Sequence, residues 1–191
     1  MDDAVRQQIL DAAEAVVLRD GHDRLRITAI ARQLGMSHAN IYRYFENRQA
    51  LVEAVAAKHL RRSLQVVRDV VEGPGSVAER LEGCFVAMAQ HKLSQVADGS
   101  HQVAAMVLEA APPLAAQHFQ QQHAQIVRLL AEGVADGGLR TLDPDAVAAT
   151  VIDAATAIYH PGLVARSDPS TLLARARALA RLLLQGLEQK T

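Results

Sequence analysis

Apolar residues recur at helical spacing along almost the whole 191-residue chain, and no segment alternates between apolar and polar residues as a half-buried strand would. Glycine and proline interrupt this pattern, most clearly in EGPGS at residues 72–76. Half of the residues are apolar, tryptophan is absent, and Ala, Leu, Val, Gln, Arg and Glu dominate. These features predict an all-α fold of about nine helices with a substantial core.

The charge of the chain is small overall but unevenly distributed. The formal net charge of -1 argues against a general polyanion binder, whereas residues 24–48 carry five arginines and a single glutamate. A local basic face is sufficient for docking to nucleic acid, because docking depends on where the charge lies.

Cysteine usage and the N-terminal pattern bear on the compartment. Cys84 is the only cysteine, which excludes an intrachain disulfide and fits a reducing environment. The chain begins without the basic-then-apolar pattern of a signal peptide, and it has no apolar run of about 18 residues. We therefore expect a cytoplasmic protein with no membrane partner.

Two short helical patterns separated by Gly35-Met36-Ser37 predict a helix-turn-helix over residues 27–46. In this motif the first helix braces the second, and Ile30, Ile41 and Phe45 supply the apolar contacts. The second helix must present small or polar groups at its N-terminal end, where it enters the major groove of DNA. Such groups are found at Ser37, His38, Ala39, Asn40 and Arg43.

Three of these residues have side chains suited to the edges of bases. Asn40 can donate to and accept from an adenine edge, or bind a phosphate. His38 can form a hydrogen bond with a purine, and Ala39 can touch the methyl group of thymine. We therefore expect the second helix to read the operator sequence.

An aromatic and basic group around this helix is suited to the DNA backbone. The hydroxyl groups of Tyr42 and Tyr44 can reach phosphates, although their rings, like that of Phe45, can instead fill a small core. Arg48, in the first turn of the next helix, is poorly placed for the helix dipole and well placed for a phosphate.

Residues 9–60 resemble the N-terminal domain of TetR-family transcriptional repressors, in the segments ILDAAEAVVLRDG, ITAIARQLGMS and ANIYRYFENRQALVEAV. The resemblance implies a DNA-binding domain over residues 1–48 and a ligand-binding and dimerisation domain over residues 49–191. The positions at which this family contacts DNA fall on Thr28, Ser37, His38, Ala39, Asn40, Tyr42, Tyr44 and Arg48.

Some positions depart from the family pattern. The family commonly has Thr or Ser capping the second helix where this chain has Arg26, which cannot cap in that way but could bind a phosphate. The family often has Lys where Arg48 stands, and an aromatic residue where Val17 and His22 stand. These differences affect the expected DNA contacts and not the assignment to the family.

The resemblance also implies that the C-terminal domain forms a homodimer through its last two helices, expected at residues 143–159 and 170–187. Small residues on the final helix would allow close approach of a partner helix. The alternative is that this face packs only within its own chain. The candidate interface residues are Ala176, Leu179, Ala180, Leu183 and Leu187.

An effector pocket is expected among the helices within residues 77–136. Methionine adapts to varied ligands, but each candidate could equally be an ordinary core residue. No constellation of charges identifies a ligand, which favours an apolar or neutral molecule. The candidate lining residues are Phe85, Met88, His91, Met106, Phe119 and His123.

Catalytic and metal-binding patterns are lacking in the sequence. It has no Gly-rich phosphate loop and no nucleophile motif, so we predict that the protein is not an enzyme and needs no cofactor. His118 and His123 are five residues apart rather than four, and no further ligands accompany them, so no metal site is predicted.

The combined prediction is a dimeric repressor that binds a palindromic double-stranded DNA operator and releases it when a small effector binds the C-terminal domain. The long helix from Asn47 to Val71 is expected to be the only element that runs from the DNA-binding domain towards the EGPGS segment. Motion of this helix would then change the distance between the two recognition helices. The alternatives are a helical adaptor and a DNA-binding protein that no ligand regulates.

Overall fold

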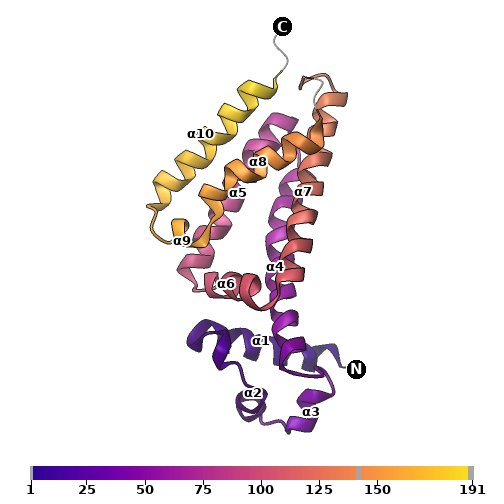
Figure 1. Cartoon of the computed structure of the whole chain (residues 1–191), viewed down its shortest axis with the longest axis vertical. Helices are drawn as coiled ribbons and strands as arrows, with labels where there is room; N and C mark the ends of the chain where they lie inside the picture. Colours follow the sequence, from indigo (N-terminus) through magenta and orange to yellow (C-terminus); the bar gives the residue numbers. More distant parts are fainter. Residues whose placement is uncertain (1, 141–142, 189–191) are drawn as a thin grey trace. The chain divides into compact units, whose positions relative to one another are not determined.

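The computed structural model describes residues 2–140 and 143–188, and its regular structure is almost entirely α-helical (Figure 1). This part of the chain contains ten α-helices and one 3-10 helix, so the predicted all-α fold is confirmed. The helix beyond the nine expected is the four-residue α9, and no described helix is long and apolar enough to cross a membrane. The elements are α1 (Asp3–Asp20), η1 (His22–Arg24), α2 (Ile27–Leu34), α3 (His38–Tyr42), α4 (Arg48–Val71), α5 (Val77–Ala97), α6 (His101–Ala110), α7 (Pro112–Ala135), α8 (Pro144–Tyr159), α9 (Pro161–Val164) and α10 (Pro169–Leu187).

Side-chain caps fix the start of most long helices, because they satisfy N–H groups that have no partner within the helix. Ser76 and Glu79 form a reciprocal capping box at the start of α5. The helix α7 begins at Pro112, because proline is tolerated in a first turn. Single side-chain caps come from Asp2, Ser37, Asn47, Asp143 and Asp168.

The helices form two compact units, each with its own core. Unit 1 comprises Met1–Arg61 and Gly99–Ala116, and unit 2 comprises Arg62–Asp98 and Gln117–Thr191. The chain therefore passes between the units three times, within α4, after α5 and within α7. Two further connections, after α5 and within α7, thus join the units besides α4. The functional division expected at residue 48 is a different boundary and stays a prediction.

Unit 1 packs the helix-turn-helix against α1, the first half of α4 and α6. Its core includes Ile30 of α2, Ile41 of α3, Leu51 of α4 and Met106 of α6, all fully buried. Lys58 of α4 also forms ion pairs with two carboxylates of α1. The base of the helix-turn-helix is therefore held by both apolar and ionic contacts.

Unit 2 is built around α5, which contacts α8, α9 and α10. Leu81 and Phe85 of α5 share a buried core with Leu129 of α7 and Leu172 of α10. At the surface, a glutamate of α5 accepts two hydrogen bonds from Arg181 of α10. This packing positions the cavity described below.

Candidate DNA interface and effector cavity

The turn between α2 and α3 depends on Gly35 and Ser37. Gly35 has a φ of 63°, in the left-handed region that favours glycine, and this conformation ends α2. The N–H of Met36 donates to the carbonyl of Ala31 over 2.8 Å. The Ser37 hydroxyl oxygen then accepts from the N–H of Asn40 over 3.2 Å and begins α3. The two helices thus form the helix-turn-helix that the sequence predicts.

The predicted base-reading residues lie on the accessible side of α3, and the bracing residues lie beneath them. Ile41 and Phe45 are buried in the core of unit 1. Tyr42 is 51% exposed, so its ring does not fill the core, whereas Tyr44 packs partly against it. The exposed predicted residues are Arg26, Thr28, Ser37, His38, Ala39, Tyr42 and Arg43, and the half-buried ones are Asn40, Tyr44 and Arg48.

Arg26 and Arg48 both donate to backbone carbonyls within unit 1. Arg48 Nε donates to the carbonyl of Leu25 over 2.9 Å, and Arg48 Nη2 donates to that of His22 over 2.7 Å. Arg26 Nη1 donates to the carbonyls of Leu25 and Asp23. These arginines therefore tie η1 to the starts of α2 and α4. A phosphate contact from Arg48 would have to come mainly from its remaining nitrogen.

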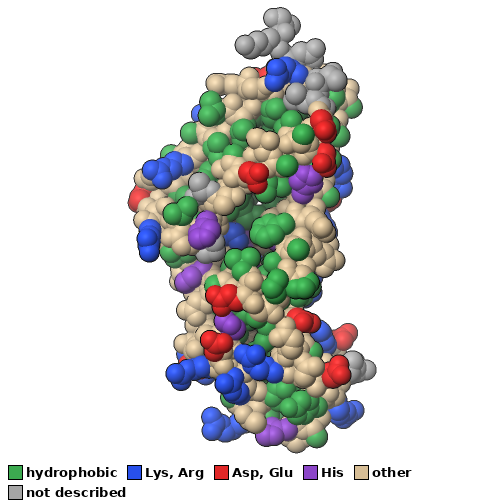
Figure 2. Space-filling model, in the orientation of Figure 1, with side chains coloured by type: hydrophobic (Ala, Val, Ile, Leu, Met, Phe, Trp, Pro, Cys, Tyr) green, Lys and Arg blue, Asp and Glu red, His purple; other side chains and the backbone are tan. Residues whose placement is uncertain are grey.

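Basic side chains are gathered over helices α1 to α3 in the view of Figure 2. Arg24 of η1, Arg32 of α2 and Arg43, directly after α3, are all exposed. Exposed arginines around a helix with free polar groups match what a polyanionic partner requires.

Unit 2 contains an apolar cavity of about 60 Å³ among α4, α5, α7 and α8. It includes Phe85 and Met88, two of the predicted effector contacts, and the ring centroids of Phe85 and Tyr159 are 6.3 Å apart. Burial raises the pKa of the Cys84 thiol to about 12, so this thiol stays protonated and inert at neutral pH. The described residues that line the cavity are Val67, Cys84, Phe85, Met88, Gln122, Ile126, Val151, Ile152, Ala155 and Tyr159.

The other predicted effector contacts lie elsewhere. Met106 is fully buried in the core of unit 1. Phe119 is 52% exposed on α7, and His123 Nε2 lies 3.2 Å from the carbonyl oxygen of Asp145. His91 belongs to a different group of polar residues. The structure therefore brings together only two of the six predicted residues in this cavity.

The polar group containing His91 is formed by facing residues of α5 and α7, and we call it the polar cluster: His91, Lys92, Gln95 and His118. Gln95 Nε2 lies 2.8 Å from His91 Nε2, and Lys92 Nζ donates to Gln95 Oε1 over 3.2 Å. His118 is 7% exposed, and its buried Nδ1 has no hydrogen-bond partner among the described residues. Lys92, Gln95 and His118 are not among the residues predicted to contact an effector.

Two family models together match most of the chain. Residues 9–55 match the model for bacterial regulatory proteins of the tetR family, and residues 78–180 match the model for the tetracyclin repressor-like C-terminal domain. The chain belongs to the tetR family. As a TetR-family transcriptional regulator it has a helix-turn-helix domain and a ligand-binding domain, and such regulators are not enzymes.

Individual relatives agree with this assignment. The HTH-type nicotine-responsive transcriptional repressor HdnoR of Paenarthrobacter nicotinovorans is 35% identical over 72 residues, which is 38% of this chain and 37% of that protein. This chain thus matches little more than a third of that relative's length. A TetR/AcrR-family regulator of Thermobifida fusca YX-ER1 has a TM-score of 0.72 and 24% identity, covering 98% of this chain and 100% of the other. FadR of Bacillus subtilis in complex with stearoyl-CoA has a TM-score of 0.70 and 19% identity, and the match covers 94% of this chain and 98% of FadR. The two structures show the shared fold.

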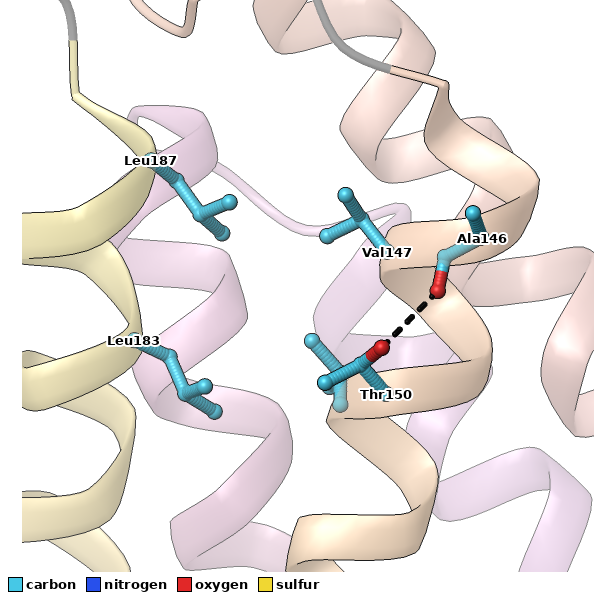
Figure 3. A pocket seen from close by; sticks show the side chains of 6 residues that line it. Ala146, Val147, Thr150, Leu183 and Leu187 are labelled. Carbon is cyan, nitrogen blue, oxygen red and sulfur yellow. Dashed lines mark hydrogen bonds between the residues drawn. The ribbon is translucent and has the colours of Figure 1, made fainter.

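The last two long helices of this TetR-family protein border a surface groove of about 220 Å³ (Figure 3). Leu183 and Leu187 of α10 face Val147 and Thr150 of α8 across it. The Thr150 hydroxyl donates to the carbonyl of Ala146 over 3.1 Å, so its one donor is used within its own helix. The groove therefore offers a mainly apolar surface.

The predicted dimer residues divide between this surface and the core. Ala176 and Ala180 are fully buried within the chain itself, because they pack in the core of unit 2. They are unavailable to a second chain, contrary to expectation. Leu179 and Leu183 are half-buried, and their neighbour Leu182 is 66% exposed.

Proposed function

We propose that this TetR-family protein is a dimeric repressor that binds a palindromic operator and releases it when a small effector binds unit 2. The observation that carries the proposal is the arrangement of α3, which presents His38, Ala39 and Asn40 on its accessible side while Ile41 and Phe45 anchor it. A helix braced in this way can enter a major groove without losing its own packing.

The DNA contacts follow from the exposed groups. Asn40 and His38 would bond to base edges, and Ala39 would lie against a thymine methyl. The hydroxyl groups of Tyr42 and Tyr44 would bind phosphates and fix the position of α3 along the groove. Two such helices, one from each protomer, would read half-sites about 34–36 Å apart or a multiple of that distance.

The second protomer would pack on α8 and α10. Leu182, the half-buried Leu179 and Leu183, and the groove beside Val147 provide the apolar surface for a two-fold interface. In this revised form of the proposal, Ala176 and Ala180 support the interface from inside their own chain.

Release would follow from a preference of the effector for one of two conformations. A ligand shifts such an equilibrium only by its differential affinity for the two states. The cavity in unit 2 supports an effector site, and the nicotine-responsive relative shows by its name that a related repressor responds to a small molecule. In this dimer, the conformation that the effector favours would hold the two α3 helices at a spacing that does not match the operator.

The test is a gel-shift titration with DNA from upstream of the gene encoding this chain, at two salt concentrations. Wild-type protein should give a specific, salt-sensitive complex. His38→Ala and Asn40→Ala should each weaken it by about 5- to 150-fold, since a good base contact contributes about 1–3 kcal/mol. Gln120→Ala, exposed on α7, is the control and should bind as wild type.

The outcomes separate the competing functions. If no specific complex forms at low salt, the protein is a helical adaptor. If both α3 variants bind the operator with wild-type affinity, α3 is not the reading helix. If a specific complex forms and no small molecule dissociates it, the protein binds DNA without ligand regulation.

A further inference from the structure

The polar cluster places a cationic side chain inside unit 2. Burial lowers the pKa of Lys92 to about 8, so this lysine is still largely charged at pH 7. Its one recorded hydrogen bond is to Gln95, a neutral amide, and no carboxylate is recorded in an ion pair with it among the described residues. Lys92 is half-buried, and a charge withdrawn from water without a counter-charge is costly, so the cluster lacks an anion.

The two histidines of the polar cluster can each offer an N–H donor. Because Gln95 Oε1 accepts from Lys92, the Gln95 amide nitrogen donates to His91 Nε2, which leaves the proton of His91 on Nδ1. Burial lowers the pKa of both His91 and His118 to about 4, and the charge of Lys92 contributes to each shift. Both imidazoles are therefore neutral at pH 7, and each can donate one N–H.

Two further charges act on His91. Arg62 lowers its pKa and Asp98 raises it, so they oppose each other at this imidazole. Neither is recorded as acting on Lys92 or His118. The charge of the cluster is therefore set by Lys92.

The polar cluster continues the apolar cavity along two helices. Lys92 lies one turn after Met88 on α5, and His118 lies one turn before Gln122 on α7; both Met88 and Gln122 line the cavity. Residues four apart lie on the same helix face. The cavity and the cluster thus occupy successive turns of the same facing surfaces.

Building on the proposed effector-controlled function, we infer that the effector is a small organic carboxylate. Its carboxylate would pair with the Lys92 ammonium and accept an N–H from His118, and its apolar body would occupy the cavity beside Phe85 and Met88. This inference replaces the expectation of an apolar or neutral ligand. One ammonium and one imidazole N–H match the two oxygens of a carboxylate. An amide of the same shape would bring N–H donors to a site that already consists of donors.

The experiment is calorimetric titration of the full chain at pH 7 with matched pairs of probes. The pairs are octanoate and octanamide, decanoate and decanamide, and benzoate and benzamide. We expect at least one carboxylate to bind about 10- to 100-fold more tightly than its amide, as a charge-assisted hydrogen bond at a buried site implies.

The variant Lys92→Met keeps the length of the side chain and removes the charge. It should bring the affinities of the acid and the amide within about twofold. The fold should stay intact, because the variant removes a half-buried cation that has no counter-charge. Arg177→Met, at an exposed position on α10, removes the same net charge and should keep the preference. His118→Gln retains an N–H donor and should lose less carboxylate affinity than His118→Leu.

The outcomes distinguish this inference from the proposed function. Equal affinity for acid and amide, a preference that survives in Lys92→Met, or no carboxylate binding at millimolar concentration overturns the inference. Gel shifts with the same probes test the function separately. Release of the operator by amides alone would leave ligand control standing without the carboxylate site. Lys92-dependent carboxylate binding that never releases the operator would support the site and contradict the proposed control.

Discussion

Replacing Arg48 by methionine should destabilise unit 1 as well as weaken DNA binding. Arg48 donates to carbonyls 23 and 26 residues earlier in the chain, and thereby joins the start of α4 to η1. The carbonyl of Leu25 also accepts from Arg26, and that of His22 also accepts from the N–H of Leu25. Neither carbonyl is orphaned by the substitution, so only the two half-exposed hydrogen bonds are lost.

The magnitude follows from that count. Two partly exposed bonds, each contributing about 0.5–1 kcal/mol after solvent screening, together contribute about 1–2 kcal/mol to the free energy of unfolding. For a chain of this size, the thermal midpoint should fall by about 2–8 °C. Amide exchange at Leu25 should also become faster, because the segment that carries it would open more often.

Circular dichroism melts and hydrogen exchange measure these effects, and gel shifts measure DNA affinity. Arg43→Met is the matched control, since Arg43 is exposed at the end of α3. It should weaken DNA binding and leave the thermal midpoint unchanged. If Arg48→Met melts and exchanges like wild type but loses DNA affinity, Arg48 is a phosphate ligand and the reasoning from its carbonyl bonds is refuted.

Three further predictions concern packing and titration. Leu182→Glu should give monomers by light scattering at micromolar concentration. The control Leu108→Glu, at a position 53% exposed on α6, should remain dimeric, and a dimeric Leu182→Glu would contradict the α10 interface. Gly133→Ala would place a new Cβ 2.7 Å from a leucine side chain. Even after the gain in helix propensity, it should lower the free energy of unfolding, measured in urea, by about 1 kcal/mol. In the control Gly186→Ala the new Cβ meets nothing within 4 Å, so this variant should not be destabilised. Burial lowers the pKa of His118 from 6.5 to about 4, so between these pH values the unfolded state binds more protons than the folded state. The melting temperature of wild type should therefore fall as the pH drops from 6.5 to 4, and that of His118→Gln should fall less. Identical pH profiles of the two melting temperatures would contradict this.

The features that the sequence predicts correctly are local ones. A cap such as Ser37 or Asn47 acts on N–H groups two or three residues later, so spacing alone specifies it. The bracing pair Ile41 and Phe45 is likewise four residues apart on a single face of the motif. Both the helix boundaries and the braced α3 could therefore be read from short segments.

The features that the sequence misses depend on contacts between distant segments. Lys92 lies in a helical pattern where a lysine normally indicates a solvated face, and only packing against other helices withdraws it partly from water. Ala176 and Ala180 belong to an apolar stripe that either the same chain or a partner could cover. Periodicity shows that a stripe exists, but which surface covers it is decided by tertiary packing against α5.

The three passages of the chain between the units suggest how a bound carboxylate would be coupled to DNA release. Gln95 lies a few residues before the passage that follows Asp98, and His118 lies two residues after Ala116, where the third passage begins. Met88, by contrast, lies about three helical turns before the passage at Asp98. The head group of the ligand would thus act on segments next to two passages, and its apolar body would contribute mainly affinity. We therefore predict that Met88→Ala weakens binding of the active probe but still allows full operator release at saturation. Lys92→Met should leave a residual complex on the gel even when the probe saturates the protein by calorimetry. If both variants release the operator completely at saturation, coupling does not run through the polar cluster.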